Sequence, residues 1–303
     1  MMAGQRRIAR SGSPDRSSVP RVHTRQPPGI DGRTQTGRKE LSGAVRCRTT
    51  NHVLADIVRV AERTWPEVEA ALDNGTRTVV VAVGSVEQHG PHLPLVIDTL
   101  AGDELSERIA AELGDTLAAP TIRPGCSGHH MDFPGTITIP AATLMDLIRS
   151  YCETLSRHGF EYVVLVPTHG GNFAPVNTVA PEIAREVNAN VIALADLGDL
   201  MTLQNEGLRE AGVEYEEPVI QAGATETAIV IAVNEGLVRT DEFDTGHEGD
   251  LSVSRLLSSG FKTIAESGVL GDPRKGTAEA GEATLDRITA AYVERIEAER
   301  NAV

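Results

Sequence analysis

The segment from Glu87 to Asp98 (EQHGPHLPLVID) holds two carboxylates and two imidazoles within twelve residues. It follows the apolar run Thr78–Val83 and a glycine, so we predict a loop at the carboxyl end of a buried strand, where open α/β sheets bind ligands. Oxygen and nitrogen donors at this density suit a divalent cation. Glu87 and His89, two positions apart, would leave the same face of an extended segment. The alternative is a polar loop in which Asp98 caps the helix that follows.

A second loop, His169-Gly170-Gly171-Asn172, follows the apolar run Tyr162–Pro167. A histidine just beyond a strand, followed by paired glycines that allow close approach, suits a metal ligand. The backbone N–H groups of Gly-Gly-Asn could instead hold a phosphate. A turn in which His169 only hydrogen-bonds the backbone is the third reading.

A third loop carries the adjacent pair His129 and His130. Adjacent side chains point to different sides, so we expect at most one to face a site. Either imidazole titrates near neutral pH and could act as a general acid or base. A surface turn with two exposed histidines is the alternative. We interpret the nearby Cys126 as a small buried residue rather than a nucleophile, because no motif pairs it with a base.

Glu226 lies at the start of an apolar helical pattern, after Gln221-Ala222-Gly223. The helix macrodipole alone favours a carboxylate in the first turn, so this position by itself does not indicate a site. We interpret Asp199 as the N-cap of a further helix and leave Asp196 without a role.

From about residue 53 onward, strand-like runs alternate with helical patterns, which is typical of a largely parallel sheet covered on both faces. We therefore predict an α/β protein with a disordered basic extension over residues 1–50 and a single domain over residues 51–303. The predicted strands are Thr78–Val83, Leu117–Thr121, Tyr162–Pro167 and Asn190–Ala195, and the predicted helices are Leu100–Leu113, Leu144–His158, Pro175–Val187, Thr225–Asn234 and Thr277–Glu299.

The composition of the 303 residues narrows the class of protein. Aromatic residues make up only 3%, so aliphatic side chains must form the core. Residues 1–50 hold 11 Lys and Arg against 3 Asp and Glu, whereas the other 253 residues hold 17 against 40. An acidic body argues against nucleic-acid and anionic-membrane partners. Three scattered cysteines and the lack of a long apolar run favour a cytoplasmic protein that does not span a membrane.

Taken together, the loops resemble one family. GSVEQHGPHLPLVIDT, GHHMDFPGTITI, THGGN, AGATET and VLGDPRKGTAEAGE are similar, in this order, to the signatures of the creatininase family of metal-dependent amidohydrolases, over about residues 53–295. The resemblance implies a three-layer α/β/α fold, one or two divalent metal ions (zinc, manganese or iron) and a homohexamer. It also implies five metal ligands, with Asp98 shared between two ions: Glu87, His89, Asp98, His169 and Glu226.

The chain departs from the family pattern at several points. His129 stands where relatives commonly have Glu, Gln221 where they have His, and Gly170-Gly171 where creatinine amidohydrolases have Tyr-Glu. Trp65 is the only tryptophan, although those enzymes enclose their substrate with tryptophans.

The resemblance implies hydrolysis of a non-peptide or cyclic amide C–N bond in a small-molecule substrate, by metal-activated water. We expect His130, or second His129, to protonate the leaving nitrogen; creatinine itself is disfavoured as the substrate. The alternatives are a flavin-precursor formamidopyrimidine deformylase, a mycofactocin-precursor peptidase, and a catalytically silent protein that binds a small molecule or phosphate.

Overall fold

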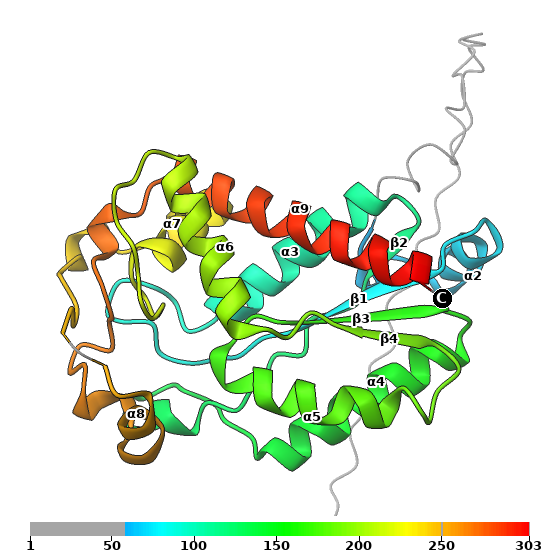
Figure 1. The fold of residues 1–303 in the computed structure, drawn as a ribbon, viewed down its shortest axis with the longest axis horizontal. Coiled ribbons are helices and arrows are strands. Elements are labelled where there is room, and N and C mark those ends of the chain that lie inside the picture. Colours follow the sequence, from blue (N-terminus) through cyan, green and yellow to red (C-terminus); the bar gives the residue numbers. More distant parts are fainter. Residues whose placement is uncertain (1–57, 250, 303) are drawn as a thin grey trace, which may run out of the picture. The chain divides into compact units, whose positions relative to one another are not determined.

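The central sheet has the predicted parallel arrangement. The computed structural model describes residues 58–249 and 251–302, so the predicted extension over residues 1–50 lies outside the described residues. In the described part, the strands pair in the order β2-β1-β3-β4, and all pairs are parallel (Figure 1). The strands are β1 (Thr78–Val83), β2 (Thr116–Ala118), β3 (Tyr162–Pro167) and β4 (Asn190–Ala193).

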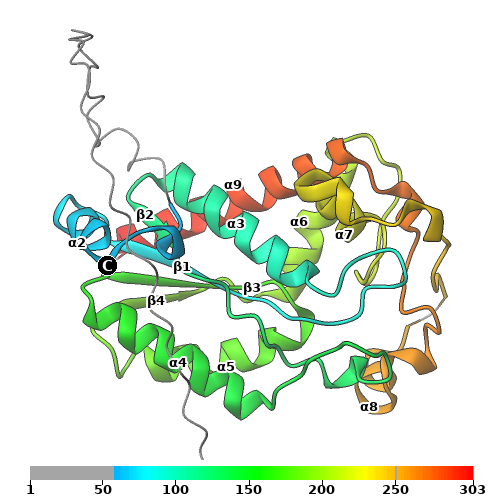
Figure 2. The ribbon, with the colours of Figure 1, turned by 180° about the vertical axis from the view of Figure 1, so that it is seen from behind.

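Helices cover both faces of the sheet and make three layers. Helices α3, α6, α7 and α9 lie on one face, and α4 and α5 lie on the other (Figures 1 and 2). Helix α2 precedes β1 at the amino end of the sheet, whereas α8 lies near the opposite end. The helices are α2 (Trp65–Asp73), α3 (Ile97–Leu113), α4 (Ala141–Arg157), α5 (Phe173–Ile183), α6 (Leu197–Glu210), α7 (Ala224–Asn234), α8 (Val253–Ser259) and α9 (Ala278–Ala302). The predicted α/β/α class is therefore confirmed.

Aliphatic side chains form the core, as the composition requires. Every residue of β1 is buried, and β3 is buried after Tyr162, because helices cover both faces of these strands. Burial of each Val or Leu side chain contributes about 1.5–3 kcal/mol to folding. Within the described residues, no helix is both long enough and apolar enough to cross a membrane.

Two predicted strands are shorter in the structure. Strand β2 ends at Ala118 rather than Thr121. The Ala119 N–H still donates to the Val80 carbonyl, but the next donor to β1 is Ile122 instead of Thr121, so the register slips by one residue here. Strand β4 ends at Ala193, two residues before the predicted end. Two glycines with positive φ, Gly114 and Gly159, follow α3 and α4 and end these helices.

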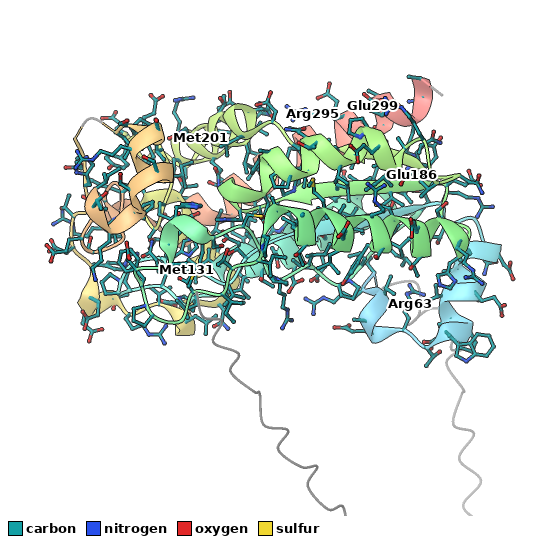
Figure 3. The ribbon with its side chains drawn as sticks, turned by 90° about the horizontal axis from the view of Figure 1, so that it is seen from below. Arg63, Met131, Glu186, Met201, Arg295 and Glu299 are labelled. Carbon is teal, nitrogen blue, oxygen red and sulfur yellow. The ribbon has the colours of Figure 1, made fainter. Side chains whose placement is uncertain are left out.

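The predicted cap of α6 is wrong, and so is the alternative reading in which Asp98 caps α3. Helix α3 begins at Ile97, three residues earlier than predicted, so Asp98 lies within its first turn and does not cap it. The N-cap of α6 is Asp196, whose extended backbone lets its carboxylate accept a hydrogen bond from the Asp199 N–H at 3.1 Å. Asp199 lies inside the helix and pairs with Arg295 of α9, which Figure 3 labels.

Candidate metal centre

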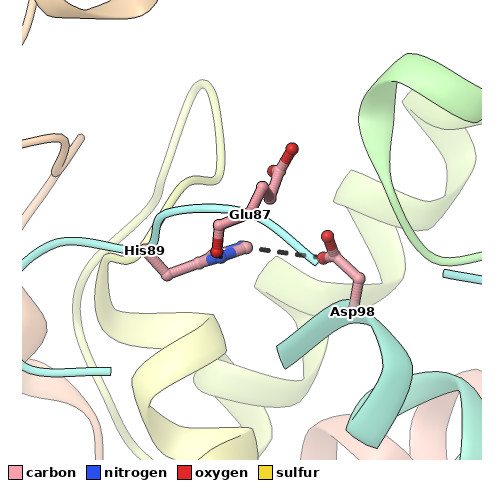
Figure 4. A group of neighbouring side chains, drawn as sticks. All are labelled: Glu87, His89 and Asp98. Atoms are coloured by element: carbon pink, nitrogen blue, oxygen red, sulfur yellow. Dashed lines mark hydrogen bonds and ion pairs between the residues drawn. The ribbon is translucent and has the colours of Figure 1, made fainter. Parts of the chain in front are cut away.

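The loop between β1 and α3 carries three of the predicted ligands. The Glu87 N–H donates to the Leu95 carbonyl at 2.8 Å, so the loop folds back and returns Asp98 to the end of β1. A Cβ on Gly84 would lie 3.0 Å from the Asp98 carbonyl oxygen, so this close return depends on glycine. Glu87, His89 and Asp98 each offer one donor atom within 4.8 Å of the others (Figure 4).

The two remaining predicted ligands reach the same place from other loops. His169, directly after β3, places Nδ1 3.1 Å from Glu87 Oε1 and 3.4 Å from Asp98 Oδ2. Glu226, in the first turn of α7, places Oε2 3.6 Å from His89 Nε2, which is also 3.6 Å from Asp98 Oδ1. The structure therefore brings together all five side chains that the resemblance implied.

Several oxygen and nitrogen atoms of this cluster that could bind a cation have no hydrogen-bond partner. Both carboxylate oxygens of Glu87, Nε2 of His89 and Oδ2 of Asp98 are buried without a hydrogen bond among the described residues. Buried polar atoms are almost always hydrogen-bonded, so four exceptions at one place call for an explanation. Carboxylate oxygens and imidazole nitrogens are the donors that zinc, manganese and iron take in proteins, and the residues present therefore fit a divalent cation.

The charges of the cluster are strongly coupled. Burial by itself would lower the pKa of His89, but the carboxylates of Glu226 and Asp98 raise it well above its ordinary value. His169 behaves in the same way, since Glu87 and Asp98 outweigh its burial. Conversely, the two imidazoles hold the pKa of Asp98 below its usual range despite the burial of that carboxyl. Opposite charges in the cluster therefore stabilise one another, and a cation would compete with protons for His89 Nε2 and His169 Nδ1.

Carbonyl oxygens orient both imidazoles of this cluster. His89 Nδ1 lies 3.2 Å from the Glu87 carbonyl oxygen, and His169 Nε2 lies 3.3 Å from that of Cys126. A carbonyl oxygen only accepts, so His89 Nδ1 and His169 Nε2, the outer nitrogens, each carry a hydrogen. The inner nitrogens, His89 Nε2 and His169 Nδ1, are then the ones that can bind a cation. Imidazoles that bind metals are usually oriented in this way.

Asn172 holds three loops together, a role that the sequence analysis missed. Its Nδ2 donates to the carbonyls of Val83 at 3.0 Å and Gly84 at 2.9 Å, and its Oδ1 accepts from the Cys126 N–H at 2.9 Å. The side chain is fully buried. A Cβ on Gly171 would lie 2.2 Å from the Cys126 carbonyl oxygen, so the paired glycines serve this close approach. The sequence shows only that an asparagine directly follows the paired glycines, which does not identify its partners.

A buried glutamate anchors the first turn of α7. Glu217 accepts hydrogen bonds from the Ala224 N–H at 2.6 Å, the Thr225 N–H at 2.9 Å and the Thr225 hydroxyl at 2.6 Å. Burial raises the pKa of Glu217 to about 7 even though these donors favour its charged form. Because Glu226 follows in the same turn, Glu217 fixes the position of that carboxylate.

The two predicted catalytic histidines both lie beside the cluster. His130 is buried, with Nε2 3.4 Å from Glu87 Oε1, and burial lowers its pKa to about 3. The His129 ring is stacked on that of His169, with centroids 5.8 Å apart. The expectation that at most one would face the site was too strict, because Gly128–His130 forms a 3₁₀ turn rather than an extended segment. Helix α8 packs against this 3₁₀ turn. The exposed Met131 follows the turn (Figure 3).

Gln221, which replaces a histidine of the family pattern, has a structural contact. Its Nε2 donates to the Gln88 carbonyl at 2.9 Å and so joins the entry to α7 to the loop after β1. Burial raises the pKa of the Cys126 thiol, which agrees with its interpretation as a packed residue rather than a nucleophile.

The known proteins similar to this chain include mycofactocin precursor peptide peptidases and creatininases. A mycofactocin precursor peptide peptidase of Mycolicibacterium smegmatis is 33% identical over 228 residues, which cover 72% of this chain and 83% of that protein. A creatinine amidohydrolase of Pseudomonas putida is 34% identical over 120 residues, covering 38% and 46%. A solved structure of a creatininase variant, of the Zn-Zn type, superposes with a TM-score of 0.71 at 24% identity, covering 80% of this chain and 98% of that one.

The family model described as creatinine amidohydrolase matches residues 61–296, which is most of the chain and contains every residue of the cluster. The solved creatininase structure shares the α/β fold described above. The chain therefore belongs to the creatininase family and is an amidohydrolase of that family.

Proposed function

We propose that five side chains hold one or two divalent cations: Glu87, His89, Asp98, His169 and Glu226. The observation that carries this proposal is their convergence around buried donor atoms that have no hydrogen-bond partner. Asp98 divides the cluster into two halves. Its Oδ1 faces His89, and its Oδ2 faces His169. This division supports two cations that share the Asp98 carboxylate, each with one imidazole and one further glutamate.

The proposed reaction is hydrolysis of an amide C–N bond. Bound cations would lower the pKa of a water molecule and polarise the amide carbonyl. The three carboxylates balance the positive charge, and the two carbonyl-anchored imidazoles keep their lone pairs directed inward. Protonation of the leaving nitrogen then falls to one of the two imidazoles beside the cluster, His130 or His129. Zinc, manganese and iron all suit these donors, and the choice among them belongs to this proposal.

For the bond that is cleaved, we propose a non-peptide or cyclic amide of a small molecule. Creatinine itself is disfavoured, since Trp65 lies on the exposed surface of α2, at the amino end of the sheet, and cannot enclose a substrate at the other end. A second candidate is cleavage of a precursor peptide. The similarity to mycofactocin precursor peptide peptidases over 72% of the chain favours it. A cytoplasmic homohexamer is part of the same proposal.

Metal analysis of the purified protein tests the centre. We expect one or two tightly held zinc, manganese or iron ions per chain, and loss of most of this metal together with turnover in Asp98→Asn. Asp286→Asn, which changes an exposed carboxylate of α9 that pairs with Arg108, is the matched control and should retain both. Equal metal content in the two variants would contradict the proposed ligand set, and a wild-type protein without metal would favour a silent binding protein.

A substrate panel then separates the candidates for the reaction. Creatinine, a formamidopyrimidine and a mycofactocin-type precursor peptide would be incubated with the metal-loaded protein, and the products identified by mass spectrometry. Release of a peptide fragment with no turnover of small amides would replace the first candidate with the second.

A further inference from the structure

The side chain of Gln88, between two of the proposed ligands, is buried and has only one acceptable orientation. Its Oε1 accepts from the Gly90 N–H at 3.0 Å, and its Nε2 donates to the Gly268 carbonyl at 3.2 Å. Reversal of the amide would set its NH₂ group against the Gly90 N–H and its oxygen against the Gly268 carbonyl, so both hydrogen bonds would be lost. The remaining hydrogen on Nε2 points to His130 Nδ1, 3.0 Å away.

This contact determines where His130 carries its hydrogen. An amide NH₂ group only donates, so His130 Nδ1 has to accept with its lone pair. A neutral imidazole has one hydrogen, which must then be on Nε2. That nitrogen faces the cluster and lies 3.4 Å from Glu87 Oε1, beyond the usual range for an N–H···O bond. The Nε2–H of His130 thus remains available to a bound substrate.

His130 therefore has the opposite polarity to the other two buried imidazoles of the site. His89 and His169 donate from their outer nitrogens to carbonyl oxygens, and their inner nitrogens have lone pairs for a cation. His130 accepts at its outer nitrogen, and its inner nitrogen presents a hydrogen. An imidazole whose outer nitrogen faces a carbonyl oxygen can bind a cation through its inner nitrogen, as at His89 and His169. His130, whose outer nitrogen faces an amide NH₂ group, can only donate from its inner nitrogen.

The segment around Gly268 packs closely against the Gln88 side chain. Its φ is +80°, and a Cβ there would lie 1.8 Å from Gln88 Oε1. Two residues further on, Leu270 pairs with Gln221, whose side chain donates to the Gln88 carbonyl. A main-chain carbonyl 180 residues away in the sequence therefore helps to hold the Gln88 amide in place.

We propose that Gln88 is a positioning residue which fixes His130 as an N–H donor to the oxygen of the reacting amide, and that His130 does not bind the metal. This inference rests on the proposed function for the identity of the site. Neutral imidazoles stabilise developing negative charge on oxygen in other enzymes. Protonation of the leaving nitrogen is then left to His129, whose ring stacks on that of His169.

NMR of the protein with isotope-labelled histidine nitrogens tests the hydrogen positions directly. Among the nine histidines, the His130 signals are identified by their loss in His130→Asn. We expect hydrogen on Nε2 of His130 and Nε2 of His169, and on Nδ1 of His89, when NMR-active cadmium ion is bound. Hydrogen on Nδ1 of His130 would overturn the proposal, and the other two histidines are internal controls in the same spectrum.

The same sample separates failure of this inference from failure of the proposed function. Cadmium should show nuclear coupling to His89 Nε2 and His169 Nδ1 and none to His130. Coupling to all three would refute the inference and leave the metal centre standing. Lack of coupling to His89 and His169 would refute the proposed ligand set itself.

Two variants of Gln88 test the positioning role. In Gln88→Glu the carboxylate can only accept, so the His130 hydrogen should move to Nδ1, and kcat should fall about 10²- to 10³-fold with a much smaller change in KM. Gln88→Met has similar length but neither donates nor accepts, so the two hydrogen positions should mix and kcat should fall less. An unchanged His130 signal in Gln88→Glu with intact cadmium binding would overturn the role assigned to Gln88.

Discussion

Replacement of Asn172 by alanine should be among the most destabilising changes near the site. The variant loses three buried hydrogen bonds, each of which contributes about 1 kcal/mol. The Val83 carbonyl would still accept from the Thr168 N–H at 3.1 Å. The Gly84 carbonyl and the Cys126 N–H keep no other hydrogen bond among the described residues, and each unpaired group costs about 1–3 kcal/mol. With about 1 kcal/mol for the bond to the Val83 carbonyl and about 1–3 kcal/mol for each of the two unpaired groups, we expect a loss of about 3–7 kcal/mol. This is a large part of a typical folding free energy of about 5–15 kcal/mol.

Urea denaturation followed by circular dichroism, with a chelator present, measures this loss apart from metal binding. The matched control is Asn177→Ala, which removes a single hydrogen bond from Asn177 to the Ala195 carbonyl and should cost about 1 kcal/mol. Equal losses in the two variants would refute the reasoning, because the three loops would then be held by other contacts. With zinc present, Asn172→Ala should also bind the ion about 10- to 100-fold more weakly, because the Cys126 carbonyl that orients His169 is displaced.

Three further changes test other parts of the site. Gly171→Ala should lower both stability and metal content, because its Cβ would lie 2.2 Å from the Cys126 carbonyl oxygen; normal metal binding would show that the loop can move. His130→Ala should lower kcat while metal analysis finds the wild-type content, and full activity would remove His130 from the reaction. Burial raises the pKa of Glu217 from 4.5 to about 7, so the stabilisation present below pH 4.5 is lost as the pH rises through 7, a decline of about 3 kcal/mol. Urea midpoints of the chelated protein between pH 5 and 8 should show this decline in the wild type and a smaller one in Glu217→Gln, and parallel curves would contradict it.

The sequence was sufficient to predict the parts of the fold that depend on local patterns. The apolar runs of β1 and β3 predicted strands, because each is short, continuously apolar and bounded by turn residues. Such runs are typical of a parallel sheet that helices cover on both faces. The carboxyl ends of parallel strands meet at one edge of the sheet, so loops after β1 and β3 had to approach each other. Glu226 was different, because its place in a helix gave no signal and only the family resemblance assigned it to the site.

The residues that support the site could not be predicted, because their partners are distant in the sequence. Asn172 bonds to residues 46 and 89 positions away, and Gln88 bonds to a carbonyl 180 positions away. An amide in isolation gives no indication of such partners. The cap of α6 was missed for a simpler reason: Asp196 and Asp199 are equivalent candidates in the sequence, and the backbone angles at Asp196 decide between them.

The four buried donor atoms without hydrogen bonds have a consequence for how much of this protein persists in a cell. Each unpaired group costs about 1–3 kcal/mol in the folded chain, whereas in the unfolded chain water satisfies it. A cation that binds only the folded form, at a concentration about 100-fold above its Kd, adds about 2.7 kcal/mol of stability. Under metal starvation the population of intact molecules would shrink through unfolding and proteolysis, so the enzyme's abundance, as well as its turnover, would follow the supply of the ion.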